Sequence, residues 1–320
     1  TRREAFGLLA GAGLASAGCS LYETPKSASL PTPASRRSHR FISRTGFAPR
    51  PGEVEDVERL GFEEWLDKQL EAGGESLRLN NRVGRLDINH FSAFELRDWN
   101  REDIIRQQQS SDILYAALSP WQVRERAIDF WTNHFNIYGR KGMAAHRIPT
   151  DHREVIRKHA LGFFPAMLKA SAHSTAMLLF LDQQASHYGQ PNENYARELL
   201  ELHTLGVGSG YTQQDVMEVA RCFTGWTEER GFLKKKGAFR FDPKLHDNGE
   251  KTVLGHTIPA DGGVEDGNKV LEILVHDPRT AAYLAKKMVD FYTGQENAEL
   301  EGRVAEAYLE HPVGDIKRCL

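Results

Sequence analysis

The sequence predicts an all-α, multi-helix domain with a small β-hairpin inserted near residues 237–256. Apolar residues recur at helical spacing through most of the chain, and Gly, Pro or capping residues bound most of these stretches. Only the region 231–263 changes character: its residues alternate between apolar and polar, and Asp247-Asn248-Gly249 is a turn sequence typical of hairpins. A chain of 320 residues can bury a sizeable core.

The expected helices are set off from one another by stop and start signals. Gly61 interrupts the first, Ser119-Pro120 separates the second from the third, and Thr212-x-x-Asp215 resembles a capping box. The expected set is Pro51–Leu70, Asp103–Leu118, Trp121–Tyr138, His152–Leu161, Phe163–Ala172, Ala176–Leu181, Asn192–Leu205, Thr212–Thr224, Val264–Val275 and Pro278–Tyr292.

The N-terminal part of the chain differs in composition from the rest. Arg2-Arg3 precedes the charge-free apolar run Gly7–Gly18, so residues 1–19 are expected to be a twin-arginine export signal. Two cleavage patterns fit: Ala15-Ser16-Ala17 suits ordinary cleavage, whereas Ala17-Gly18-Cys19 suits a lipoprotein signal that would lipidate Cys19. Residues 20–38 are rich in Ser and Pro and are expected to form a flexible tether.

The helical domain is then expected over residues 39–320, and to be incomplete at its C-terminus because the chain stops within a helical pattern. The net charge of −3 gives no electrostatic support for nucleic-acid binding. Membrane attachment is expected only through the N-terminal lipid anchor, in the periplasm or cell envelope. Three cysteines do not predict a disulfide framework.

The helix expected at Asn192–Leu205 carries the main candidate site. Glu198 and Glu201 are three residues apart, so their carboxylates are neighbours that could serve as acid and base or coordinate a cation. The alternative is a solvated face on which Arg197 pairs with Glu201 and Glu193. At about 100° per residue, one side carries Tyr195, Leu199, Leu202 and His203, and the other carries Asn194, Arg197, Glu198 and Glu201.

Two further histidines are candidates. His134 falls on the apolar stripe of Trp121–Tyr138, where it is either a core residue with a satisfied ring nitrogen or, with Asn133, a base or ligand that reaches into a pocket. His246-Asp247 precedes the turn, which could present His246 to a site. His-Glu-x-x-His and Cys-x-x-Cys are absent, so neither a metal nor another cofactor is predicted from motifs.

Several separated motifs stand out in the chain: the longest is Asn192–Gly206, followed by Tyr211–Val216 and Phe223–Trp226. Together these motifs resemble the bacterial domain of unknown function 1800 (DUF1800) family. The resemblance departs at His173-Ser174-Thr175-Ala176-Met177, where the family has His-Pro-Ala-Met. The other segments that fit, in the family's order, are His39–Phe47, Asp129–Phe135, Leu181-Asp182, His246-Asp247 with Lys251–Gly255, and His276–Pro278.

The resemblance implies an exported, largely helical protein, often encoded beside a second family that resembles sulfatases and alkaline phosphatases. It implies no particular reaction. It does make the polar residues of the motifs candidates for a shared site. The candidate catalytic residues are Glu198, Glu201, His134 and Arg197, and the candidate binding residues are Asn133, Asp182, Asn192, Asn194, His203, His246 and Asp247.

Three functional hypotheses follow. The first is an envelope hydrolase acting on a carbohydrate or other surface polymer, in which Glu198, Glu201, His134 and His246 converge on one pocket. The second is a non-catalytic binding or assembly partner of the co-encoded sulfatase- or phosphatase-like protein, in which the Arg197–Glu201 pair is structural. The third is a metal carrier.

Overall fold

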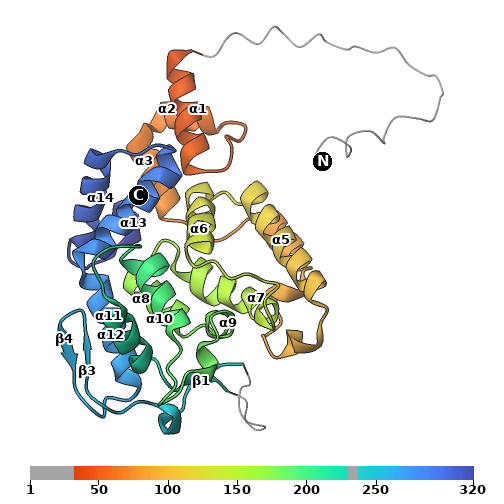
Figure 1. The fold of residues 1–320 in the computed structure, drawn as a ribbon. Coiled ribbons are helices and arrows are strands. Elements are labelled where there is room, and N and C mark those ends of the chain that lie inside the picture. Colours follow the sequence, from red (N-terminus) through yellow and green to blue (C-terminus); the bar gives the residue numbers. More distant parts are fainter. Residues whose placement is uncertain (1–31, 230–236) are drawn as a thin grey trace, which may run out of the picture.

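The computed structural model describes residues 32–229 and 237–320, and their fold is mainly helical, which confirms the expected class (Figure 1). The expected export signal, Cys19 and residues 20–31 of the expected tether lie outside the described residues. Helix α1 begins at Pro33, so residues 33–38 are helical where a tether was expected. The side chain of Thr32 caps this helix by accepting from the Ser35 amide at 3.1 Å, and Pro33 occupies the first helical position.

The helices are α1 (Pro33–Thr45), α2 (Glu53–Leu60), α3 (Phe62–Leu70), α4 (Leu77–Val83), α5 (Arg101–Leu118), α6 (Gln122–His134), α7 (Ile148–Asp151), α8 (Phe164–Ala172), α9 (Thr175–Phe180), α10 (Glu193–Glu198), α11 (Gln213–Cys222), α12 (Val264–His276), α13 (Pro278–Thr293), α14 (Ala298–Leu309) and α15 (Ile316–Cys319). Two π-helical turns, η4 (His152–Arg157) and η6 (Leu199–Thr204), extend α7 and α10. Short 3₁₀ turns are η1 (Asp87–Asn89), η2 (Glu95–Asp98), η3 (Ala144–His146), η5 (Gln183–Ala185) and η7 (Pro243–Leu245).

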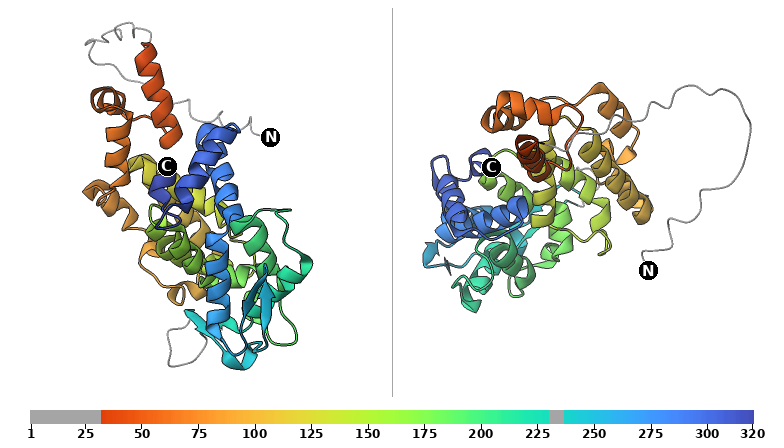
Figure 2. Two further views of the ribbon diagram at one scale, coloured as in Figure 1. Left: turned by 90° about the vertical axis from the view of Figure 1, so that its left-hand side faces the viewer. Right: turned by 90° about the horizontal axis from the view of Figure 1, so that it is seen from above.

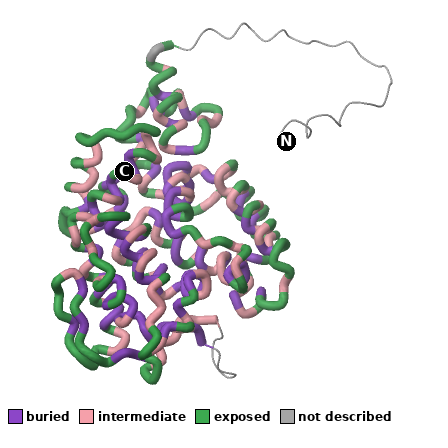
Figure 3. The backbone as a smooth tube through the Cα atoms, in the orientation of Figure 1, coloured by how far each residue is buried: buried purple, intermediate pink, exposed green. Residues whose placement is uncertain are grey.

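The central helices α6, α8 and α10 are surrounded by the others, with α1–α3 at one end of the molecule and the strands at the opposite end (Figures 1 and 2). Helices α13 and α14 pack against each other along one side, and α5 lies on the other side. The main core is built around Trp131, Phe164, Tyr195 and Phe223, all nearly fully buried, and buried segments run through the central helices in Figure 3.

The β insertion consists of two small antiparallel sheets, whereas the sequence predicted one hairpin. Strand β1 (Trp226–Glu228) pairs with β2 (Phe239–Phe241), and β3 (Lys251–Val253) pairs with β4 (His256–Ile258). The tight turn of the second sheet is Leu254-Gly255, whose φ angles of 50° and 81° allow the two-residue connection. The predicted turn at Asp247–Gly249 instead joins the two sheets.

The remaining helix boundaries differ modestly from expectation. Helix α6 ends at His134 and not near Tyr138, and α4 was not expected. The capping box at Thr212 and Asp215 is confirmed, with both hydrogen bonds formed. Among the described residues, no helix has the length and apolar character needed to cross a membrane.

Candidate functional site

The residues before α10 tie the start of this helix to a turn. The Asn192 side chain accepts from the Asn194 amide at 2.9 Å and donates to the Asp182 carbonyl at 3.0 Å. The Asn194 side chain donates to the Leu181 carbonyl at 3.3 Å. Asp182 has a left-handed backbone (φ 59°) and pairs with Lys141 at 2.7 Å. These three predicted binding residues therefore position the helix.

The polar side of α10 forms an ion-pair network. Arg197 contacts Glu193 at 3.1 Å and Glu201 at 3.6 Å, and donates to Gln213 of α11 at 2.9 Å. Partial burial raises the pKa of Glu198, and the Glu201 charge adds to that effect. Because Arg197 connects α10 to α11, this is the structural network expected for the non-catalytic hypothesis.

The predicted apolar side of this helix is confirmed except at one residue. Tyr195, Leu199 and His203 are buried as expected, whereas Leu202 is 45% exposed. The Leu205 amide bonds to the Leu200 carbonyl at 2.9 Å, a five-residue π-helical step, whereas the sides were assigned for 3.6 residues per turn. The π turn coincides with the exposure of Leu202.

His134 is a core histidine. Its Nδ1 lies 3.0 Å from Lys287 Nζ, and its Nε2 lies 3.1 Å from the His203 carbonyl oxygen. An ammonium group only donates and a carbonyl only accepts, so the neutral ring carries its proton on Nε2. Burial lowers the pKa of both His134 and His203, and the Lys287 charge lowers each further. Both of the ring's nitrogens are thus occupied by protein partners.

His246 belongs to a separate buried cluster. Its Nε2 lies 3.1 Å from Asp266, which also pairs with Lys251 at 2.5 Å. The side chains of His246 and Lys251 are fully buried and that of Asp266 is 2% exposed. Asp247 receives Arg221 at 2.8 Å. This cluster joins α11 and α12 to strand β3.

The structure therefore does not bring the four predicted residues together in one pocket. Glu201 pairs with Arg197, and Glu198 lies on the same helix. His134 contacts Lys287, and His246 contacts Asp266. The local sequence pattern placed these residues on helices or beside a turn, but it could not show which partner each polar side chain meets.

A cleft of about 220 Å³ between α5, α6 and η4 gathers a different set of titratable residues. Helix α6 contacts both α5 and η4, and α5 and α6 are labelled in Figure 1. The apolar part of the lining comes from Phe47, Ile113, Ala116 and Ile128. The polar part comes from Asp112, Glu125, Asp129, Thr132, His152 and Arg157.

Asp112 is the most perturbed carboxyl group of this cleft. Its Oδ1 accepts from Gln108 Nε2 at 2.9 Å and lies 3.5 Å from His152 Nε2. Gln108 Nε2 also lies 3.2 Å from His152 Nδ1 and can only donate, so the neutral His152 ring carries its proton on Nε2, facing Asp112. Burial raises the pKa of Asp112 to about 6, and the charges of Glu125 and Asp129 add to the shift.

The two other carboxylates are held by arginines. The two carboxylate oxygens of Glu125 accept hydrogen bonds from the two Nη atoms of Arg157, at 2.7 and 2.8 Å. Asp129 pairs with Arg126 at 2.9 Å and accepts from the Asn133 side chain at 3.3 Å. The cleft thus holds a carboxyl group that is easily protonated near two arginine-paired carboxylates, an arrangement that separates the roles of acid and base.

A helical pattern in the sequence could have located this cleft. Glu125, Asp129 and Thr132 follow at spacings of four and three residues, so they share one face of α6. The motif Asp129–Phe135 was noted for His134, which lies on the opposite, buried face. The binding candidate Asn133 does contact the cleft, through Asp129.

The family model for proteins of unknown function DUF1800 matches residues 40–320. The chain belongs to the DUF1800 family. This result confirms the resemblance drawn from the motifs, and it assigns no reaction. None of the curated proteins and none of the solved structures compared matches the chain.

The metal-carrier hypothesis requires several metal-binding side chains that lie close together. Within residues 32–229 and 237–320, no group of three or more His, Cys, Asp or Glu side chains is placed to hold a metal ion. The buried Cys222 and Cys319 are both free. The described part of the chain thus offers nothing in favour of the metal-carrier hypothesis.

Proposed function

We propose that this DUF1800 protein is an exported cell-envelope hydrolase that acts on a carbohydrate or other surface polymer at the Asp112 cleft. One observation carries the proposal. Asp112 lines a cleft with 43% of its side chain exposed, yet its surroundings raise its pKa to about 6. A carboxyl group that is accessible and partly protonated near neutral pH suits general acid catalysis.

Asp112 and Asp129 divide the work of hydrolysis. Protonated Asp112 gives its proton to the leaving-group oxygen as the bond between carbon and that oxygen breaks. Asp129 takes a proton from water as the water oxygen bonds to the same carbon. Solvent then returns a proton to Asp112 and removes one from Asp129. Glu125 is less suited as base because its side chain is only 3% exposed and Arg157 binds both of its oxygens, whereas the side chain of Asp129 is 37% exposed.

The lining favours a polar substrate with an apolar face. Phe47, which is 40% exposed, and Ile113, which is 67% exposed, offer an apolar wall. Thr132 and Asp129 also line the cleft, and their oxygen atoms can form hydrogen bonds with the hydroxyl groups of a ligand. A sugar unit combines these two surfaces. Because the cleft is open and small, the rest of a polymer would lie outside it.

The test compares Asp112→Asn and Asp129→Asn with the wild-type protein on purified cell-envelope polysaccharide and on 4-nitrophenyl glycosides. The reaction is followed by the release of reducing ends or nitrophenol. We expect each variant to lose about 10²-fold or more in kcat. Asp103→Asn is the matched control, since Asp103 lies on the same helix but is exposed and pairs with exposed Arg106. Equal rates for all four proteins would contradict the proposal.

A non-catalytic role as assembly partner of a sulfatase- or phosphatase-like exported protein is the second candidate. The contacts of Arg197 favour this role, because Arg197 pairs with Glu193 and Glu201 and also donates to Gln213, which joins α10 to α11. Co-purification from the native host distinguishes the candidates. A stoichiometric complex that survives Glu198→Gln, with no hydrolysis by the isolated protein, supports the second.

A further inference from the structure

Helix α1 carries an unusual concentration of positive charge. Its sequence includes Arg36, Arg37, Arg40 and Arg44 and contains no acidic residue. All four arginines are exposed, and none forms an ion pair with any described residue. Charges left without partners on one short helix are available for a ligand.

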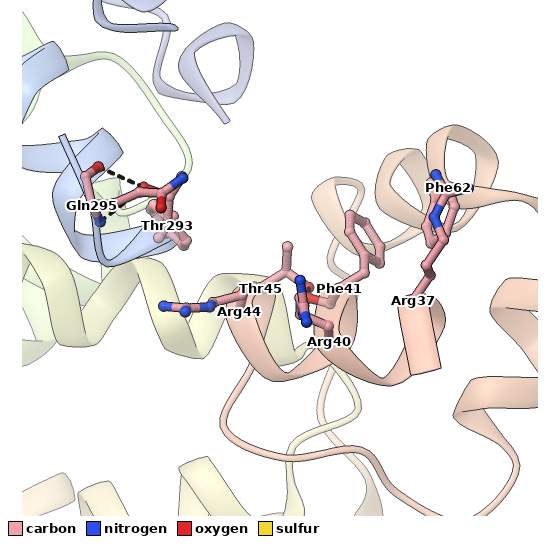
Figure 4. A pocket seen from close by; sticks show the side chains of 9 residues that line it. Arg37, Arg40, Phe41, Arg44, Thr45, Phe62, Thr293 and Gln295 are labelled. Atoms are coloured by element: carbon pink, nitrogen blue, oxygen red, sulfur yellow. Dashed lines mark hydrogen bonds between the residues drawn. The ribbon is translucent and has the colours of Figure 1, made fainter. Parts of the chain in front are cut away.

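Three of these arginines line a cleft of about 760 Å³ between α1 and the end of α13. Arg37, Arg40 and Arg44 project from successive turns of α1, with Arg37 toward Phe62 and Arg44 toward Thr293 and Gln295 (Figure 4). None of the lining side chains is acidic. The nearby Glu296 pairs with Lys286 at 3.2 Å.

The fold positions two of the guanidinium groups. The Arg37 guanidinium lies 5.7 Å from the centre of the Phe62 ring, a cation–π distance. Arg44 packs against Gly294, where a Cβ atom would lie 2.7 Å from Arg44 Nη1. Gly294, with φ 70°, ends α13, so Arg44 lies beside the carbonyl end of that helix, whose partial negative charge offsets only part of the arginine charge.

Tyr292 lines the same cleft with a neutral side chain. Its hydroxyl group is buried without a hydrogen-bond partner among the described residues, and the charged groups that act on its pKa are Arg126 and Asp129 of α6. Burial raises the pKa of Tyr292, so this residue adds no negative charge beside the arginines.

We propose that the cleft formed by Arg37, Arg40, Arg44 and Tyr292 binds a phosphate-bearing ligand. Arginine forks match phosphate oxygens in charge and geometry, and neighbouring arginines can share one phosphate group or two linked ones. The phosphate comes either from an anionic lipid headgroup or from a soluble phosphorylated molecule. This proposal is independent of hydrolysis at Asp112, because the two clefts share no lining residue.

The test measures two probes on the full chain: pyrophosphate by calorimetry, and vesicles of phosphatidylcholine with or without phosphatidylglycerol by flotation. We expect Arg40→Gln to weaken binding by about tenfold or more. Arg36→Gln is the matched control, since Arg36 is exposed on the same helix but does not line the cleft. Added salt should weaken binding of both probes.

Binding of pyrophosphate without vesicles supports the site with a soluble ligand, and binding of phosphatidylglycerol vesicles supports it with a lipid headgroup. Thermal unfolding checks that each variant is folded. The proposal is overturned if the wild type binds neither probe, or if Arg40→Gln and Arg36→Gln bind equally well.

Discussion

Asp112→Asn should stabilise the protein at neutral pH. Burial raises the pKa of Asp112 from 3.8 to about 6, so ionising this carboxyl group opposes folding. Between those values the folded state binds more protons than the unfolded state, and the free energy of unfolding falls as pH rises. The destabilisation caused by ionised Asp112 is absent below about pH 4 and reaches its full size above about pH 6.

The size of the effect follows from the shift and from exposure. At 1.36 kcal/mol per pKa unit, the shift corresponds to about 3 kcal/mol for a fully shielded group. The Asp112 side chain is 43% exposed, so screening by solvent reduces this to about 1.5 kcal/mol. Asparagine keeps an oxygen that can accept from Gln108 and carries no charge.

Urea unfolding of the wild type, Asp112→Asn and Asp103→Asn at about pH 4 and about pH 7.5 measures the effect. We expect Asp112→Asn to exceed the wild type by about 1.5 kcal/mol at the higher pH, with a much smaller difference at the lower pH. Asp103→Asn should match the wild type at both. A gain that does not depend on pH, or a loss at pH 7.5, would refute the reasoning.

Two further predictions concern Arg197 and the buried partner of His246; Arg197 and His246 are residues that the sequence favoured. Asp266→Asn should cost about 3–5 kcal/mol of unfolding free energy, because Lys251 would remain buried beside His246 without a counter-charge; a loss below about 1 kcal/mol in urea unfolding would show that the buried pair is not formed. Arg197→Gln should lower the unfolding free energy by less than about 1 kcal/mol, because the Arg197–Glu201 pair is partly exposed, and it should leave the rate of hydrolysis unchanged. A loss of activity as large as that of Asp112→Asn would instead indicate that the active site lies at α10.

Much of the fold could be predicted because helix signals are local. The capping box at Thr212, the break at Gly61 and the stop at Ser119-Pro120 all act within a few residues of the helix that they bound. Strand pairing is not local. Phe239–Phe241 was expected in a hairpin with the strand after it, but it pairs with Trp226–Glu228 before it. Alternation identifies a strand without naming its partner.

The candidate site was harder to predict because it depends on tertiary contacts. The sequence placed Glu125 and Asp129 on one helix, but the perturbation of Asp112 arises where α5 and η4 approach them. The polar motif residues were expected to form one site, but each histidine has its own distant partner. His134 contacts Lys287, which is more than a hundred residues away in the sequence, and His246 contacts buried Asp266, about twenty residues away. The π turn at Leu199–Thr204 also has no signature in hydrophobic spacing.

The pH dependence of kcat/KM on cell-envelope polysaccharide tests the central claim most directly. If Asp112 is the general acid, wild-type activity declines as pH rises through about 6, because the proton that it donates is lost. The decline should be absent from the residual activity of Asp112→Asn and preserved in Asp103→Asn. A wild-type profile that is flat between about pH 5 and 8, or a decline that persists in Asp112→Asn, would contradict the assignment of the catalytic acid to Asp112.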